Sequence, residues 1–152
     1  MTILRNREGQ NLKVLSDTIC IKLKSMQSPN QMAVVTVDVP PGGFVPPHTH
    51  NQEEESYYVL EGSMVMKIGN EEFEIESGDF VHIPPNTVHG YQNNSDRALR
   101  FLAWTVGGAI DEFFIEMDRE IREIPDDLSK LPAIIERYGI AMTEPAPPAI
   151  PG

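Results

Sequence analysis

Two stretches that carry histidines constrain the fold of this chain more than any other feature of its sequence. The first covers residues 42–62 and contains His48 and His50. Side chains two positions apart on a β-strand point to the same face, so these two imidazoles would lie together. Three consecutive glutamates follow at 53–55, and one of them can place a carboxylate beside the imidazoles. Such groups are common ligands of divalent metal ions, and the stretch therefore predicts most of a metal site.

The second stretch covers residues 78–93 and supplies a candidate for the missing ligand. A short apolar segment leads into a turn at 84–86, and His89 follows it. The chain has 4 histidines, of which His82 is the only one outside these ligand-like positions. We expect His82 to be a strand or rim residue and His89 to complete a set of three imidazole ligands.

The apolar residues around these stretches follow the alternating pattern of half-buried β-strands. Ile19, Ile21 and Leu23 show the pattern first. Further segments of this kind lie at residues 32–39, 57–68 (two strands), 80–83 and 99–104. Many short strands separated by turns of glycine, proline and asparagine predict an all-β sandwich or barrel.

The pattern changes from strand to helix after residues 107–108, a pair of glycines. Apolar residues recur every three or four positions at 110–117, and a second helical segment starts near residue 126 and stops at Gly139. We expect the apolar stripe of the first helix to dock on the barrel or on another subunit. The last eight residues include four prolines, which predicts an extended tail at 145–152.

At 152 residues the chain has the length of one domain, and it shows no internal repeat. We assign residues 1–106 to the β-barrel and residues 107–152 to a helical extension with a proline-rich tail. Both parts are expected to belong to the same domain.

The two histidine stretches resemble the two sequence motifs of the cupin family. The first cupin motif joins two glycines through His-x-His and a glutamate, and it is matched at Gly42, His48, His50, Glu55 and Gly62. The second motif is matched at Gly78, Pro84, His89 and Asn93. Asn86 stands where that motif has a glycine, and asparagine tolerates the positive φ that such a turn requires. We expect Asn93 to stabilise the turn after His89.

The resemblance implies a double-stranded β-helix, the jelly-roll barrel of cupins, with a metal site inside one end. The implied ligands of one divalent ion per chain are His48, His50, Glu55 and His89. Iron, nickel, manganese, cobalt and zinc all suit this set. Glu55 would also act as a general base toward the substrate. Cupins are commonly dimers, so a homodimer is expected.

The chain after the barrel looks like the C-terminal part of bacterial single-domain cupins described as quercetinase-like. This likeness rests on Phe113-Phe114 and on Tyr138-Gly139-Ile140. It favours a metal-dependent dioxygenase that acts on a small, aromatic hydroxy-carbonyl compound. Two other classes stay open: a metal-dependent isomerase, cyclase or decarboxylase, and a non-catalytic protein that binds a small molecule.

The three glutamates leave two candidates for the carboxylate ligand. Glu55 and Glu54 follow His50 by five and four positions, and we prefer Glu55 because only its spacing to Gly62 fits the motif. We expect Glu53 to be solvated.

Strand parity predicts part of the substrate pocket. If Glu55 faces inward, Tyr57 shares its face and borders the pocket. Further candidates for the wall are Met64 or Met66, Phe101 and Trp104. A mostly apolar pocket favours an aromatic or aliphatic ligand over a phosphorylated one.

Charge and composition limit the partners. The net charge of −11 and the isoelectric point of about 4.7 oppose binding to nucleic acid or to an anionic membrane. The single cysteine, Cys20, cannot form an internal disulfide, and no apolar segment of signal-peptide or membrane-helix length is found. We therefore expect a cytoplasmic protein whose partners are a small-molecule substrate and a second copy of itself.

Overall fold

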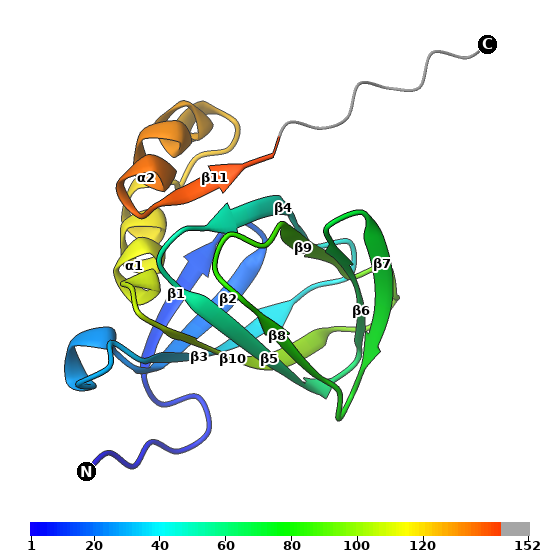
Figure 1. The fold of residues 1–152 in the computed structure, drawn as a ribbon, viewed down its shortest axis with the longest axis horizontal. Helices are drawn as coiled ribbons and strands as arrows, with labels where there is room; N and C mark the ends of the chain where they lie inside the picture. The colour runs from blue at the N-terminus through cyan, green and yellow to red at the C-terminus, as the bar shows by residue number, and fades with distance from the viewer. Residues whose placement is uncertain (144–152) are drawn as a thin grey trace.

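The computed structural model describes residues 1–143, which form a β-barrel with a short C-terminal helical extension (Figure 1). The predicted tail at 145–152 lies outside the described residues. In chain order the elements are β1 (Gln10–Val14), β2 (Asp17–Leu23), η1 (Ser25–Gln27), β3 (Ala33–Val39), β4 (Phe44–His50), β5 (Glu54–Glu61), β6 (Ser63–Ile68), β7 (Glu71–Glu76), β8 (Phe80–Ile83), β9 (His89–Gln92), β10 (Leu99–Val106), α1 (Ile110–Glu120), η2 (Asp126–Lys130), α2 (Leu131–Arg137) and β11 (Ile140–Met142).

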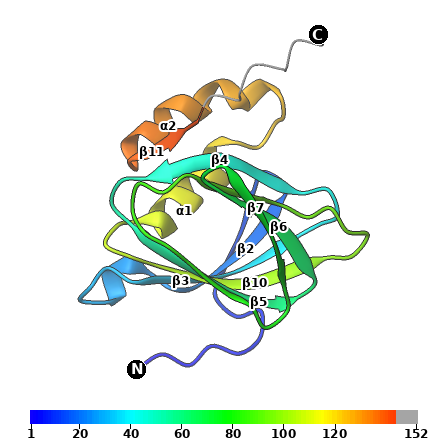
Figure 2. The ribbon, with the colours of Figure 1, turned by 45° about the vertical axis from the view of Figure 1, so that its right-hand side comes forward.

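The strands form two antiparallel sheets that face each other around a common interior (Figure 2). One sheet has six strands in the order β1-β2-β3-β10-β5-β8, and the other has five in the order β11-β4-β9-β6-β7. Strands distant in sequence, such as β3 and β10, are neighbours because the chain passes repeatedly between the sheets. This is the all-β fold that the strand pattern predicts, in the jelly-roll form that the resemblance implies.

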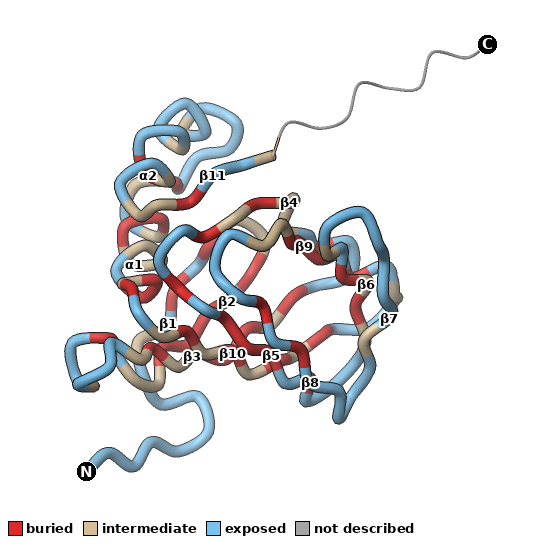
Figure 3. The backbone as a smooth tube through the Cα atoms, in the orientation of Figure 1, coloured by how far each residue is buried: buried red, intermediate tan, exposed pale blue. Residues whose placement is uncertain are grey.

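Buried and more exposed residues alternate along the strands, and the buried ones form the core between the sheets (Figure 3). In β10 the buried residues Leu99, Phe101, Ala103 and Thr105 alternate with residues that are only partly buried. A two-residue turn joins β6 and β7, as its Gly-Asn sequence predicts. Asn86 has a φ of 63°, the left-handed conformation expected at the turn before β9.

The C-terminal extension packs on the side of the barrel that carries β1 and β4 (Figures 1 and 2). Its first helix, α1, buries Met117 in the main hydrophobic core, so the apolar stripe docks on the barrel. The extension ends in β11, which pairs with β4 and places Ile140 opposite His50 and Met142 opposite His48. The sequence analysis did not predict β11. Among residues 1–143, no helix is long and apolar enough to span a membrane.

Candidate metal centre

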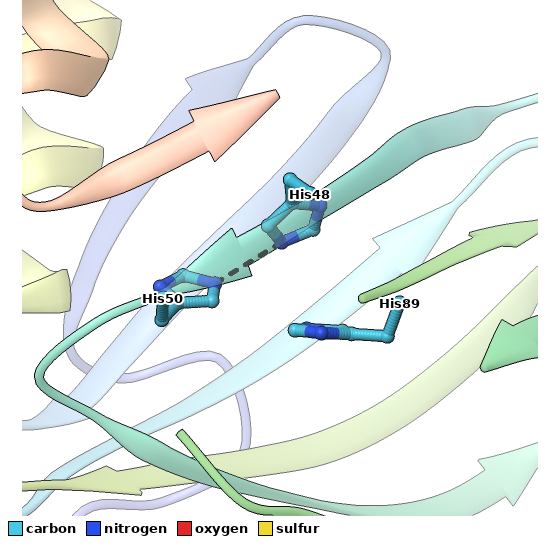
Figure 4. A group of neighbouring side chains, drawn as sticks. All are labelled: His48, His50 and His89. Carbon is cyan, nitrogen blue, oxygen red and sulfur yellow. Dashed lines mark hydrogen bonds between the residues drawn. The ribbon is translucent and has the colours of Figure 1, made fainter. Parts of the chain in front are cut away.

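Three imidazoles converge inside the barrel from two neighbouring strands (Figure 4). His48 and His50 lie on β4, and His89 is the first residue of β9, where it pairs directly with His48. The Nε2 atoms of His48 and His50 are 3.0 Å apart, and all three side chains are buried. The possible ligand atoms of the three histidines lie within 4.8 Å of one another.

Glu55 brings a carboxylate to the same point from the opposite sheet. Its Oε2 atom lies 3.0 Å from Nε2 of His89 and 3.5 Å from Nε2 of His50. Glu55 is buried, whereas Glu54 is exposed because it points to the other face of β5. Of the two acids considered as ligands, only Glu55 therefore reaches the imidazoles.

The hydrogen bonds on the far side of the rings orient the imidazoles. Nδ1 of His48 lies 2.8 Å from the carbonyl oxygen of Pro46, and Nδ1 of His89 lies 2.9 Å from that of Thr87. A carbonyl oxygen can only accept, so these partners assign the ring protons to Nδ1 and leave the Nε2 lone pairs directed at the cluster. Backbone oxygens often orient metal-binding histidines in this way.

The spacing of these atoms fits a divalent ion. Ligand atoms that bind one ion at about 2.1 Å, at right angles to each other, lie about 3 Å apart. The contacts of 3.0 Å between His48 and His50, and between His89 and Glu55, agree with that arrangement. Three neutral imidazoles and one carboxylate are a donor set that iron, manganese, nickel, cobalt and zinc accept.

Burial and mutual charge set the protonation states of these groups. Burial, together with the neighbouring imidazoles His89 and His50, lowers the pKa of His48 to about 4, so its ring is neutral near pH 7. Burial alone would raise the pKa of Glu55, but the close contact with Nε2 of His89 and the adjacent imidazoles lower it to about 2, so the carboxylate is ionised near pH 7. Burial and the negative charge of Glu55 raise the pKa of Tyr57 well above its usual value, so this phenol stays protonated.

Glu53 corrects the sequence analysis, which expected a solvated side chain. It is only 2% exposed, and its Oε1 atom accepts a hydrogen bond from the backbone N–H of Ala109, at 3.2 Å. Its Oε2 atom lies 3.4 Å from Nδ1 of His50. Glu53 lies two positions before Glu55 and one position before β5 begins, so alternation continued back from β5 was the available signal for its burial. Glu53 therefore lies next to the ring nitrogen of His50 that faces away from the cluster, in a charge contact longer than the hydrogen bonds made by the other two rings.

We expect Glu53→Gln to weaken metal binding by about tenfold, because removing a charged partner from a metal-binding histidine has effects of this size. Glutamine keeps the length of the side chain and an oxygen for the Ala109 N–H, so the loop should stay in place. The dissociation constant for zinc, measured by competition with a chromophoric chelator, checks this result. Glu54→Gln is the control, and equal affinities of the two variants would contradict the role of Glu53.

Two further residues lie where the sequence analysis expected them. His82 is exposed on β8, away from the cluster, with Nδ1 3.1 Å from Oγ of Ser56. Asn93 is fully buried, and its side-chain amide donates to the carbonyl oxygens of Val39 and Arg97. His82 is thus remote from the cluster, and Asn93 ties the end of β9 to the neighbouring strand and loop.

A cavity of about 140 Å³ opens beside the imidazoles. Tyr57, Phe101 and Trp104 border it, although the ring of Trp104 stacks against the exposed ring of Phe80, with centroids 6.0 Å apart. The prediction of Met64 or Met66 in the wall was wrong, because both side chains are buried in the core and neither lines this cavity.

The C-terminal extension supplies a wall of this cavity that the sequence analysis did not assign. Residues of α1, α2 and β11 border the cavity opposite the barrel strands, namely Ile110, Phe113, Phe114, Met117, Leu131, Ile135, Ile140 and Met142. These side chains are apolar, so the cavity excludes water well and holds an apolar or aromatic body better than a charged one.

The sequence comparisons agree with the motifs. Residues 35–105 match the family described as a cupin domain. The chain is 31% identical over 112 residues to a quercetin 2,3-dioxygenase from Bacillus subtilis, in an alignment that covers 74% of this chain and 33% of that protein. An uncharacterized protein from Methanocaldococcus jannaschii is 42% identical over 64 residues, which cover 42% of this chain and 51% of that protein. The aligned parts thus cover a third to a half of these relatives.

Solved structures share the fold at low identity. A predicted oxalate decarboxylase from Thermotoga maritima has a TM-score of 0.64 and 24% identity, covering 69% of this chain and 98% of that chain. The polyketide cyclase RemF from Streptomyces resistomycificus has a TM-score of 0.60 and 24% identity, covering 70% and 79% of the two chains. Sequence identities this low show that the chains share a barrel fold, and they do not identify a reaction for this chain.

Proposed function

This chain belongs to the cupin superfamily, and we propose that it is a metal-dependent dioxygenase acting on a small, aromatic hydroxy-carbonyl compound. In this proposal His48, His50, Glu55 and His89 hold one divalent ion per chain. The observation that carries it is the convergence of these four side chains, of which His48, His50 and Glu55 border a mostly apolar cavity. The similarity to a quercetin 2,3-dioxygenase supports the choice of reaction.

The residues of the chain have separate tasks in this reaction. A bound divalent ion would supply the Lewis acid that polarises a substrate oxygen and a centre for reaction with dioxygen. Glu55, whose Oε2 atom lies 3.0 Å from Nε2 of His89, would accept the proton of a substrate hydroxyl that the bound ion makes more acidic, and this would leave an electron-rich enolate. The apolar wall of the extension excludes water, which strengthens the electrostatic interactions inside the cavity.

The character of the cavity favours an uncharged aromatic substrate. Among the described residues that line it, none is a lysine or an arginine, so a phosphorylated sugar would find no countercharge. A volume near 140 Å³ is similar to that of an engineered cavity that holds benzene, at about 150 Å³. A single-ring hydroxy-carbonyl compound therefore fits inside, and a larger flavonol would extend toward the opening.

Oxygen uptake is the direct test. We expect protein loaded with iron, nickel, manganese or cobalt to consume dioxygen when a flavonol or a hydroxypyranone is added, in a constant ratio to substrate lost. The His48→Ala/His89→Ala variant is the blank, since it lacks two of the proposed ligands. Substrate conversion without oxygen uptake would replace the dioxygenase by an isomerase, cyclase or decarboxylase. Ligand binding that survives complete metal removal would favour the non-catalytic binding protein.

We also propose that the chain forms a homodimer. Large apolar side chains are exposed on neighbouring strands of the six-stranded sheet, with Tyr58 on β5 paired to Phe80 on β8. A second copy covering this face would bury both rings. Light scattering should then give twice the chain mass of 17.0 kDa, and a mass of one chain would contradict the dimer.

A further inference from the structure

A buried acid and a tyrosine face each other in the same cavity, away from the proposed metal ligands. Asp17 is the first residue of β2, and Tyr91 lies on β9 in the other sheet. The hydroxyl of Tyr91 donates a hydrogen bond to Oδ2 of Asp17, and Oγ of Ser16 donates to Oδ1 at 3.1 Å. Asp17 is 3% exposed and Tyr91 8% exposed, and both border the cavity.

Asp17 and Tyr91 are polar residues in a part of the cavity wall that is otherwise apolar. The other residues along this part of the wall are apolar, namely Val14, Leu15, Ile19, Val37, Val45 and Phe101. Each carboxylate oxygen of Asp17 has one hydrogen-bond partner, which offsets part of the cost of burying an acid in such a place. An ionised carboxylate can accept about four hydrogen bonds, and the side chains around Asp17 donate two. Capacity therefore remains for a donor that enters the cavity.

Asp17 and Tyr91 lie about the length of one aromatic ring from the proposed metal ligands. Tyr91 follows His89 by two positions on β9, so the two residues share a face and are separated by about 6.6 Å along the strand. A series of ring contacts joins them across the cavity. The centroid of His89 lies 6.4 Å from Tyr57, Tyr57 lies 5.3 Å from Phe101, and Phe101 lies 5.4 Å from Tyr91.

We propose that Asp17 and Tyr91 form a second polar contact for the substrate and select ligands with a hydroxyl group on the far side of the ring from the chelating oxygens. The inference rests on the proposed function, because it takes the chelating end of the ligand to lie at His48, His50, Glu55 and His89. An O–H group donates to Asp17, whereas a carboxylate or phosphate there would be repelled by the acid. The substrate class is thus a single aromatic or enolic ring with a hydroxy-ketone at one end and a hydroxyl at the other.

Kojic acid and allomaltol are matched probes of this contact. Both chelate a metal through a hydroxy-ketone, and allomaltol has a methyl group where kojic acid has a hydroxymethyl group. Binding to the zinc-loaded protein, in which zinc prevents oxidation, can be measured by titration calorimetry. We expect kojic acid to bind about tenfold more tightly than allomaltol, the size of one hydrogen bond to a charged group.

The double variant Asp17→Leu/Tyr91→Phe tests the pair itself. Both replacements are apolar and of similar shape, and removing both partners together avoids leaving one of them unpaired. We expect the ratio of the two affinities to fall to about one in this variant. Glu54→Gln, which is exposed on β5, should keep the wild-type ratio.

Three other results would each overturn the inference, and each would identify which part of it is wrong. Equal affinities of the two probes for the wild-type protein would show that the pair makes no contact with the ligand, while leaving the metal site intact. A preference for kojic acid that persists in the double variant would show that the pair only joins the two sheets. If neither probe binds the zinc-loaded protein, the chelating substrate class fails together with this inference.

Discussion

Glu55→Gln is expected to lower the affinity for a divalent ion by more than about 100-fold, since replacing residues that merely orient the ligands already costs about 10–100-fold. The carboxylate is the only negative group among the four proposed ligands, and a neutral amide is a weaker ligand for a divalent cation. Any metal restored by excess in solution should still give no turnover, because glutamine cannot accept the substrate proton. Competition with a chromophoric chelator measures the affinity, and oxygen uptake measures turnover.

Glu54→Gln is the matched control for this prediction. It makes the same chemical change at the next position, but Glu54 is exposed on the opposite face of β5. Its metal affinity and turnover should equal those of the wild-type protein. Thermal unfolding of the metal-free variants should show that both are folded. Equal losses in the two variants would mean that the carboxylate near His89 is not a ligand.

The resemblance to the cupin motifs predicted the convergence of the four side chains, and local periodicity predicted only which face of its own strand each residue occupies. The parity of a strand decides which face a residue occupies, and this places His48 beside His50 and separates Glu55 from Glu54. The turn at Asn86 could be predicted because few residues adopt a positive φ. Strand parity and turn conformation depend on residues that are close in the sequence, so both can be predicted from the sequence.

Contacts between distant segments could not be predicted in this way. The three residues of β11 are too few to show a period, and they form a strand only because the edge of β4 offers unpaired backbone groups. The sequence analysis assigned no role to Asp17, whose partner Tyr91 is 74 positions away. Met66 has the parity of a buried residue, but burial alone does not decide between the core and a cavity wall.

The extension shows how such distant contacts complete the site. The pairing of β11 with β4 places Ile140 and Met142 opposite His50 and His48, so the strand that carries two proposed ligands is not an edge. The same segment brings the apolar wall of α1 and α2 over the cavity. The helical part therefore contacts the strand that carries two of the proposed ligands and borders the cavity beside them.

Gly90→Ala is expected to destabilise the protein by about 3 kcal/mol, the upper range for overfilling a packed interior. A Cβ atom at Gly90 would lie 2.6 Å from the carbonyl oxygen of Val45 and 2.9 Å from backbone atoms of Pro46 and Pro47. These are main-chain atoms, so β4 itself must move. The pairing between β4 and β9 shifts register between Val45 and His48, and this irregular segment crosses directly over Gly90.

The consequence for the site distinguishes this substitution from an ordinary loss of stability. Moving β4 away from β9 separates His48 from His89, so Gly90→Ala should also bind zinc at least tenfold more weakly than the wild-type protein, an effect comparable to disturbing the support of a ligand. Gly69→Ala is the control, because its Cβ would meet no atom within 4 Å and only its φ of 59° is unfavourable. That variant should lose about 1 kcal/mol and keep its metal affinity. Urea unfolding of the metal-free proteins, combined with zinc titration of the folded ones, measures both effects. If the two variants unfold at the same urea concentration and bind zinc equally, close approach of β4 to Gly90 is not what aligns the histidines.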